Sequence, residues 1–178
     1  MKRGDSKNYI LAFDPSITAW GWVVLEPNGK VVDFGCFKTS PENKVRKIRK
    51  GDDTVRRIGE ILEHFIKVID QYRIRLIVTE MPHGSQNASG AQMIGICLGL
   101  VASLGKMYEI PVEWYTEGEC KKNALNKRSA TKKEMIEAMD KFYDVPWKGV
   151  KYHDEAVADA ISIYHMARSE SSILKFLL

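Results

Sequence analysis

The connections between the first three apolar segments are too short for crossovers. Residues 9–13, "WGWVVLE" at 20–26 and "KVVDFGCFKT" at 30–39 each have the composition of a β-strand. Asn28-Gly29, between the second and third segments, is a hairpin turn signal. A parallel pair needs a connection of roughly a dozen residues or more. The three segments are therefore predicted to form an antiparallel meander.

The rest of the chain alternates helices with short strands. Apolar residues recur at helical spacing over residues 52–72, and "RLIVTE" at 75–80 is typical of a buried parallel strand. A long helix rich in glycine and alanine is expected at 85–109, then a strand at 111–116, basic helices, and an amphipathic helix at 153–170. The order βββ-α-β-α-β-α predicts an α/β fold, with a mixed five-stranded sheet flanked by helices in one domain over residues 1–178.

Composition narrows the environment and the partners. The formal net charge of +4 permits nucleic-acid binding, and the positive charge is clustered. The three cysteines have no zinc-ligand spacing, so we expect reduced thiols and a cytoplasmic location. No signal-peptide core is visible, and the most apolar helix, around Met93 to Leu104, is shorter than the roughly 20 residues that span a bilayer. No membrane partner is expected.

Three acids stand at the ends or edges of apolar elements. Asp14 ends "LAFD", Glu80 ends "LIVTE", and Asp159 interrupts "AVADAISIY". Any one of them is best explained as a surface residue or a helix cap. Together they favour a shared metal site, because clustered carboxylates repel one another without a cation and suit Mg²⁺ or Mn²⁺.

At these motifs the chain resembles the RuvC-type Holliday junction resolvases of the RNase H-like superfamily, in particular the phage branch. "FDPSITAWGWVV" is similar to the family's first strand and its return, "IVTEMP" to its fourth strand, and "HDEAVADAISI" to its acidic helix. The ordered set covers nearly the whole chain and is more specific than any single motif. The resemblance implies an RNase H-like fold and a location in bacterial or phage-infected host cytoplasm.

The resemblance also implies the site residues. Asp14, Glu80 and Asp159 match metal ligands, and all three are expected to be catalytic. The family adds a fourth ligand shortly before the last aspartate. We rank Glu155 and Asp154 close together for this catalytic and metal-binding role, with one of them capping a helix that starts near Glu155, and we place His153 behind them. His83 stands where cellular relatives carry an aromatic wedge, so we count it among the DNA-binding residues.

The implied reaction is metal-assisted phosphodiester hydrolysis of branched DNA. Two Mg²⁺ ions roughly 4 Å apart are expected, with Mn²⁺ able to substitute and Asp14 bridging them. Lysines after the fifth strand match DNA-contacting positions of the family, and Thr131 with Glu134 fits a capping box beside them. These DNA-contacting positions are Lys121, Lys122, Lys127, Arg128, Lys132 and Lys133. A second candidate contact track comprises Arg46, Lys47, Arg49, Lys50, Arg56 and Arg57.

The expected partners are a four-way DNA junction and a second copy of the chain. Small residues along the long helix, which lines the dimer interface in the resembled family, favour a homodimer. Three alternatives stay open. One is an RNase H-like nuclease acting on flaps, forks or RNA–DNA hybrids, and another is a non-catalytic junction-binding protein. An actin-like ATPase or sugar kinase is disfavoured because that fold needs two such domains.

Overall fold

A computed structural model describes residues 7–178 and contains the predicted meander. The first three strands pair antiparallel, and their register sets Asp14 opposite Gly21 and Gly21 opposite Cys36. Asn28 sits in the tight turn that the Asn-Gly pair predicted, where Gly29 adopts a positive φ of 100°. The strands are β1 (Tyr9–Asp14), β2 (Ala19–Leu25), β3 (Val31–Lys38), β4 (Ile74–Glu80) and β5 (Val112–Tyr115).

All five strands join one mixed sheet in the order β3-β2-β1-β4-β5. β4 runs parallel to β1, and β5 runs parallel to β4. The connection from β4 to β5 contains the helix at residues 88–107, and the connection from β1 to β4 contains the rest of the meander and the helix at residues 50–71. The predicted α/β class and the mixed five-stranded sheet are confirmed.

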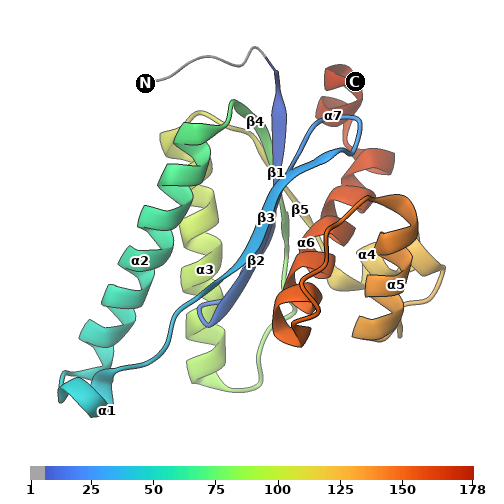
Figure 1. Cartoon of the computed structure of the whole chain (residues 1–178). Coiled ribbons are helices and arrows are strands. Elements are labelled where there is room, and N and C mark those ends of the chain that lie inside the picture. Colours follow the sequence, from blue (N-terminus) through green and yellow to red (C-terminus); the bar gives the residue numbers. More distant parts are fainter. Residues whose placement is uncertain (1–6) are drawn as a thin grey trace.

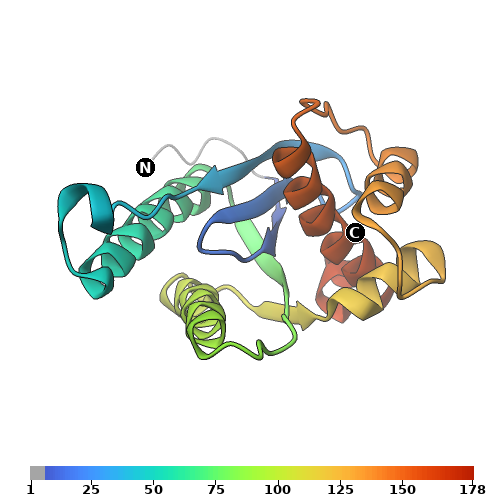
Figure 2. The same ribbon diagram turned by 90° about the horizontal axis from the view of Figure 1, so that it is seen from below.

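Helices cover both faces of the sheet (Figures 1 and 2). Two long helices, α2 and α3, lie on one face, and α4, α5 and α6 lie on the other, with α6 crossing the strands diagonally. The helices are α1 (Asn43–Arg46), α2 (Lys50–Gln71), α3 (Ala88–Met107), α4 (Glu117–Leu125), α5 (Lys132–Phe142), α6 (Lys151–Glu170) and α7 (Ser172–Leu177).

Alternation along the strands sorts side chains between two hydrophobic cores. In β1, Leu11 and Phe13 join the core under α2 and α3, whereas Ile10 and Ala12 join the core under α5 and α6. Asp14 continues the second series, so strand geometry directs it to the α6 side. This assignment decides on which face an active site can form.

Arg57 lies inside the protein rather than on a DNA-contacting surface. Its guanidinium donates to Thr39 Oγ1 at 2.7 Å and to the Ile17 carbonyl at 2.9 Å, and the residue is 8% exposed. Its assignment to the second basic track is therefore wrong. Arg57 instead ties α2 to the β1–β2 turn and to the segment after β3.

Helix α3 is shorter than the predicted range of 85–109, but its apolar part is longer than the stretch from Met93 to Leu104. By length and composition alone it is the one helix in residues 7–178 that passes a test for membrane spanning, with a mean hydropathy of 1.5. Only 22% of that apolar window is buried in the structure. The expectation that this segment is too short to span a bilayer is therefore wrong on length, and most residues of the window are half-buried or exposed rather than buried by the rest of the chain.

Candidate active site

Two of the predicted acids end neighbouring parallel strands. The register sets Phe13 of β1 beside Thr79 of β4, so Asp14 and Glu80 are the next residues along each strand. The carboxyl ends of parallel strands meet at one edge of a sheet, which is where ligands bind in α/β proteins. Both side chains are partly buried and lie on the face covered by α6.

Asp159 reaches the same place from α6. It is 8% exposed and is surrounded along the helix by buried residues such as Val157, Ala160 and Ile163. Lys132, from the first turn of α5, forms an ion pair and a hydrogen bond with its carboxylate. The helix can approach this closely because Gly21 faces the Ala156 carbonyl, where a Cβ would lie 2.1 Å from the oxygen.

The electrostatics identify these three acids as one cluster. Burial, then the negative charges of Asp159 and Glu80, raise the pKa of Asp14 well above its usual value. Burial, with Asp159 next, raises the pKa of Glu80 to about 7. Burial also raises the pKa of Asp159, although Lys132 opposes the shift. The ionised forms of these three carboxyl groups are therefore destabilised, and a bound positive charge would stabilise them.

The donor set suits a hard divalent cation. Among the described residues, no hydrogen bond or ion pair reaches the carboxylates of Asp14 and Glu80, so their oxygens are available. Within residues 7–178, no three His, Cys, Asp or Glu side chains already form a coordinating cluster. Binding a metal would therefore require side chains to shift, with Asp159 turning away from Lys132. The oxygen chemistry and the unpaired carboxylates fit Mg²⁺ or Mn²⁺.

The two acids ranked for the fourth position have different surroundings. Asp154 accepts hydrogen bonds from the Lys148 amide and from His153 Nδ1, each at 3.1 Å. Its assignment as a helix cap is wrong, because α6 begins at Lys151 with Val150 at the N-cap position. Glu155 is partly exposed. Their roles as metal ligands stay predictions.

A fourth acid that the sequence reading missed does meet the cluster. Glu117 opens α4, two residues after β5 ends. Its negative charge raises the pKa of Asp14, Glu80 and Asp159, in each case behind the larger effect of burial. The signal was present, because "WYTE" follows the same pattern of a strand running into an acid.

The basic residues after β5 differ in whether they pair with the acid cluster. Lys121 pairs with Glu117 at 2.6 Å, and Lys132 pairs with Asp159, so these two ammonium groups belong to the acid cluster. Lys127 pairs with Glu134 at 2.8 Å across the capping box of α5, which forms as predicted. The remaining predicted DNA contacts, Lys122, Arg128 and Lys133, are exposed.

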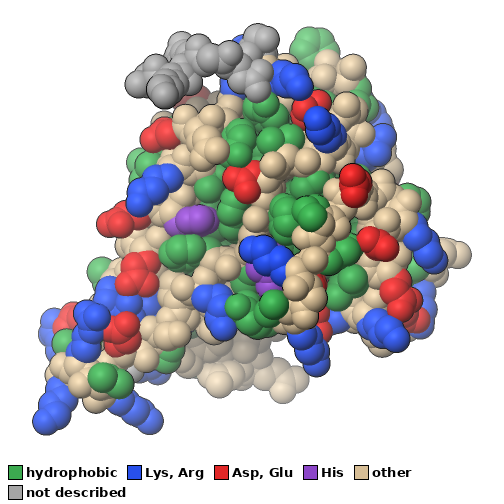
Figure 3. Space-filling view, in the orientation of Figure 1, with side chains coloured by type: hydrophobic (Ala, Val, Ile, Leu, Met, Phe, Trp, Pro, Cys, Tyr) green, Lys and Arg blue, Asp and Glu red, His purple; other side chains and the backbone are tan. Residues whose placement is uncertain are grey.

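His83 and the first four residues of the second basic track, Arg46, Lys47, Arg49 and Lys50, lie at the surface, whereas Arg56 is half-buried and pairs with Asp53 and Glu60. His83 is exposed in the β4–α3 segment and, after the larger effect of the Lys121 hydrogen bond, helps to lower the pKa of Glu117. His83, the predicted wedge residue, therefore lies near Glu117. Lys and Arg side chains also gather over α1 and the start of α2, at the lower left of Figure 3.

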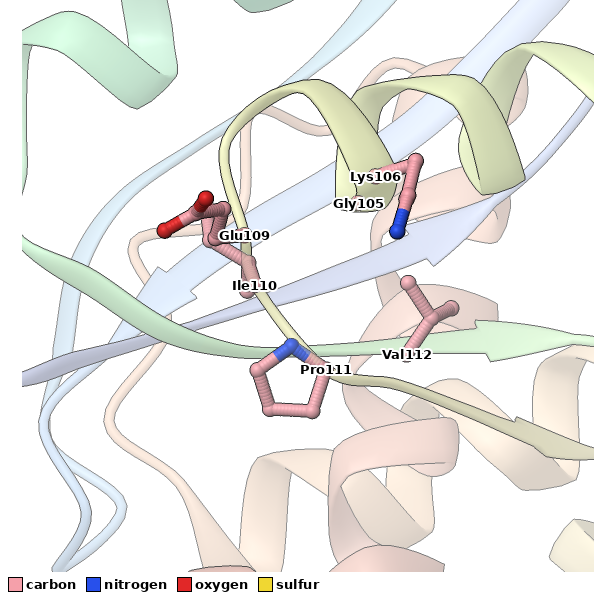
Figure 4. A pocket seen from close by; sticks show the side chains of 6 residues that line it. All are labelled: Gly105, Lys106, Glu109, Ile110, Pro111 and Val112. Carbon is pink, nitrogen blue, oxygen red and sulfur yellow. The ribbon is translucent and has the colours of Figure 1, made fainter.

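One hollow in the surface is unrelated to the acids. It has a volume of about 610 Å³ and lies where α3 turns into the amino end of β5, whereas the acids lie at the carboxyl ends of the strands (Figure 4). Its lining is largely backbone and apolar side chain, with no convergent set of polar groups. The residues are Gly105, Lys106, Glu109, Ile110, Pro111 and Val112.

The sequence and the fold were compared with those of known proteins. No protein-family model matches the chain. Curated relatives named crossover junction endodeoxyribonuclease RuvC include one from Methylobacillus flagellatus, 25% identical over 159 residues, covering 88% of this chain and 85% of the relative. Another, from Pseudothermotoga lettingae, is 27% identical over 164 residues, covering 89% and 93%.

Solved structures show the same architecture. Thermus thermophilus RuvC in complex with a Holliday junction substrate superposes with a TM-score of 0.70 at 20% identity, covering 89% of this chain and 91% of that one. A yeast mitochondrial Holliday junction resolvase gives 0.65 at 10% identity, covering 96% and 81%. The chain therefore has the RNase H-like α/β fold of these proteins. Within that class, its fold and sequence are similar to those of RuvC-type Holliday junction resolvases.

Proposed function

We propose that the chain is an endodeoxyribonuclease that cleaves branched DNA, with a four-way junction as its substrate. The observation that carries this proposal is the meeting of Asp14, Glu80 and Asp159 at one edge of the sheet. Similarity to the RuvC proteins supports the choice of substrate. Flaps, forks and RNA–DNA hybrids are the alternative substrates, because the same acids would serve them.

The chemistry follows from the charges of the site. Asp14, Glu80 and Asp159 would hold Mg²⁺, which supplies Lewis-acid activation of the phosphodiester and of the attacking water. Lys132 would hold Asp159 in the absence of metal and is positioned to meet a phosphate oxygen once that carboxylate turns away. The partial burial of Asp14 limits competing solvation of its carboxylate.

Exposed lysines and arginines flanking the acids would bind the DNA backbone. Lys122, Arg128 and Lys133 lie on the α4–α5 side, and the surface of α1 and the start of α2 carries the second group. Phosphate contacts of this kind position a duplex without reading its sequence. His83, between Glu80 and α3, is suited to stacking on a base at the junction centre.

We further propose that the chain is a homodimer in the cytoplasm. The exposed side of α3 carries small residues, and a Cβ built at Gly95 or Gly99 meets no atom within 4 Å. Small residues let two helices approach closely, and a second α3 would cover apolar surface that the chain itself leaves open. Exposed Ser89, Gln92 and Lys106 on the same helix disfavour a lipid environment.

Cleavage assays on matched substrates test the proposal. Four-way, flap, fork and RNA–DNA hybrid substrates would be incubated with the protein in Mg²⁺ or in EDTA. We expect Mg²⁺-dependent cleavage of the four-way junction in preference to the others. Asp14→Asn and Glu80→Gln should retain junction binding in gel shifts and lose cleavage by about a hundredfold or more, because each removes a metal ligand.

A matched control separates the site from general damage. Asp144→Asn neutralises an exposed acid in the segment between α5 and α6 and should cut at the wild-type rate. Wild-type cleavage by Asp14→Asn would remove the acid cluster from the reaction. Preferential cutting of a hybrid would replace the junction as the substrate, and absence of cutting on every substrate would leave a junction-binding protein.

A further inference from the structure

We propose that Glu117 supplies the fourth carboxylate of the metal site, from the strand side of the site rather than from α6. This inference rests on the proposed nuclease function and concerns how its metal is held. It replaces the expectation that the fourth ligand comes from Asp154 or Glu155.

The sheet register brings Glu117 to the acids. Tyr115 of β5 is the partner of Glu80 in β4, and the Met81 amide donates to the Tyr115 carbonyl at 2.8 Å. Glu117 follows this pair by two residues, where the chain leaves the sheet to start α4. β5 therefore delivers Glu117 to the same edge at which β1 and β4 deliver Asp14 and Glu80.

The start of α4 fixes the position of Glu117. Thr116 and Glu119 form a reciprocal capping box, in which the Thr116 amide donates to Glu119 Oε2 at 2.8 Å and Thr116 Oγ1 accepts from the Glu119 amide at 3.3 Å. Because Glu119 satisfies the helix terminus, Glu117 is not needed as a cap. α4 also packs against α6, the helix that carries Asp159.

The contacts of Glu117 are those of a cluster member. Lys121, one turn further along α4, pairs with its Oε1 at 2.6 Å, with side chains 15% exposed for Lys121 and 40% for Glu117, and Lys132 pairs with Asp159 between α5 and α6. Four ionised carboxylates and these two lysines would leave a net charge of minus two, which one divalent cation balances. After the larger effect of burial, the negative charge of Glu117 also raises the pKa values of Asp14, Glu80 and Asp159.

The α6 acids lack this relationship. The Asp154 carboxylate accepts hydrogen bonds from the Lys148 amide, on the loop that precedes α6, and from His153 within α6. Asp154 is also five residues before Asp159, which places the two on different sides of the helix. Glu155 shares a side with Asp159 but lies one turn nearer the helix start, and its side chain is partly exposed.

Metal binding to the DNA-free protein tests the assignment. Isothermal titration calorimetry with Mn²⁺ alone would compare the wild type with Glu117→Gln, Glu155→Gln and Asp154→Asn, after circular dichroism has established that each variant is folded. We expect Glu117→Gln to weaken Mn²⁺ binding by about tenfold or more, or to remove one binding event. The two α6 variants should titrate as the wild type does.

Two further variants separate a ligand from a charge effect. Glu117→Gln frees the ammonium of Lys121, so the double variant with Lys121→Gln restores the local charge. If Glu117 binds the metal, affinity stays low in the double variant; recovery of wild-type affinity overturns the inference. Unchanged titration of Glu117→Gln, or loss confined to Glu155→Gln, also overturns it. Asp14→Asn distinguishes the two proposals, because its unchanged titration would remove the metal site itself.

Discussion

Gly21 of β2 lies directly against the carbonyl oxygen of Ala156 in α6, with no room for a side chain between them. Gly21 is also the cross-strand partner of Asp14. This one close contact therefore sets the distance between α6 and the sheet at the position of Asp14. The separation of Asp159 from Asp14 depends on it.

Replacing Gly21 should damage both stability and activity. A Cβ there would sit 2.1 Å from the Ala156 oxygen, so Gly21→Ala must push α6 away from β2. We expect a loss of about 2–4 kcal/mol in the free energy of unfolding and a loss of cleavage in the protein that stays folded. Urea denaturation and a junction cleavage assay measure the two effects.

A second glycine gives the control for this substitution. A Cβ at Gly59 in α2 meets no atom within 4 Å. Gly59→Ala should stabilise the protein by roughly 0.5–1 kcal/mol, because alanine is the better helix former, and leave cleavage unchanged. Equal stability of Gly21→Ala and the wild type would show that α6 is not held at this contact.

Stability of the metal-free protein should fall as pH rises through the titration of Glu80. Its pKa is raised from 4.5 to about 7 in the folded state, so the folded protein binds the proton more tightly than the unfolded chain does. The loss of folding stability caused by ionising Glu80 is absent below the pKa of the unfolded chain, 4.5, and complete above the pKa of the folded protein, about 7. In EDTA, Glu80→Gln should gain on the order of 1–3 kcal/mol at about pH 8 and nothing near pH 4.

Metal should reverse this penalty. Mg²⁺ neutralises the carboxylates, so its stabilising effect on the wild type should be larger above pH 7 than below it, and should shrink in Glu80→Gln. Thermal unfolding with and without Mg²⁺ at both pH values measures it. Glu63→Gln, which removes an exposed acid from α2, should behave as the wild type. A wild-type pH profile in Glu80→Gln would contradict the assignment.

Arg57 should be a large contributor to stability despite its distance from the acid cluster. Its removal leaves the buried Thr39 hydroxyl without the guanidinium that donates to it at 2.7 Å, and it takes one of two donors from the Ile17 carbonyl. Arg57→Met should therefore cost about 2–4 kcal/mol of unfolding free energy. Arg49→Met, at an exposed ion pair, should change it by less than about 1 kcal/mol. Similar losses in both variants would contradict a structural role specific to Arg57.

The sequence was sufficient for the order of helices and strands and for the antiparallel meander, because these follow from local pattern. Short connections determined the meander, and apolar runs ending in Asp14 and Glu80 located one sheet edge. Arg57 was misassigned because Arg56 and Arg57 look alike in sequence, and only contacts from Ile17 and Thr39, distant along the chain, bury one of them. Likewise, the local pattern gave no reason for α6 to begin at Lys151 and turn Asp154 toward the preceding loop.

Glu117 was missed for a different reason. One residue, Thr116, separates Glu117 from the end of β5, and the nearness of Glu117 to Glu80 depends on the pairing of β5 with β4. Strand pairing is long-range information that composition and periodicity do not contain. Conversely, "TEGE" follows the capping-box pattern that was recognised at Thr131, so the start of α4 was predictable.

The α3 surface should determine the oligomeric state. Gly95→Arg places a long charged side chain where the structure leaves open space, and it should convert a dimer into monomers by blocking close helix approach. Sedimentation velocity, on the free protein and on its junction complex, gives the mass. Gly51→Arg at the start of α2 adds the same charge elsewhere and should stay dimeric. A wild-type protein that is monomeric in both states would contradict the homodimer.

Junction affinity should fall steeply with salt, and the slope should depend on the exposed basic residues rather than on those paired with the acid cluster. Each lysine or arginine that contacts a phosphate releases counterions and adds close to one unit to the slope of log affinity against log salt. Lys122, Arg128 and Lys133 are exposed, whereas Lys121 already holds Glu117 at 2.6 Å.

Gel shifts over roughly 50 to 200 mM salt would compare two sets of variants. The triple variant Lys122→Ala, Arg128→Ala and Lys133→Ala should flatten the slope by about two to three units. Lys121→Ala should change it by less than one unit, because an ammonium engaged with a carboxylate has little left for phosphate. An unchanged slope in the triple variant would move the DNA track to the α1–α2 surface, and a larger change in Lys121→Ala would mean that its pair with Glu117 opens on binding.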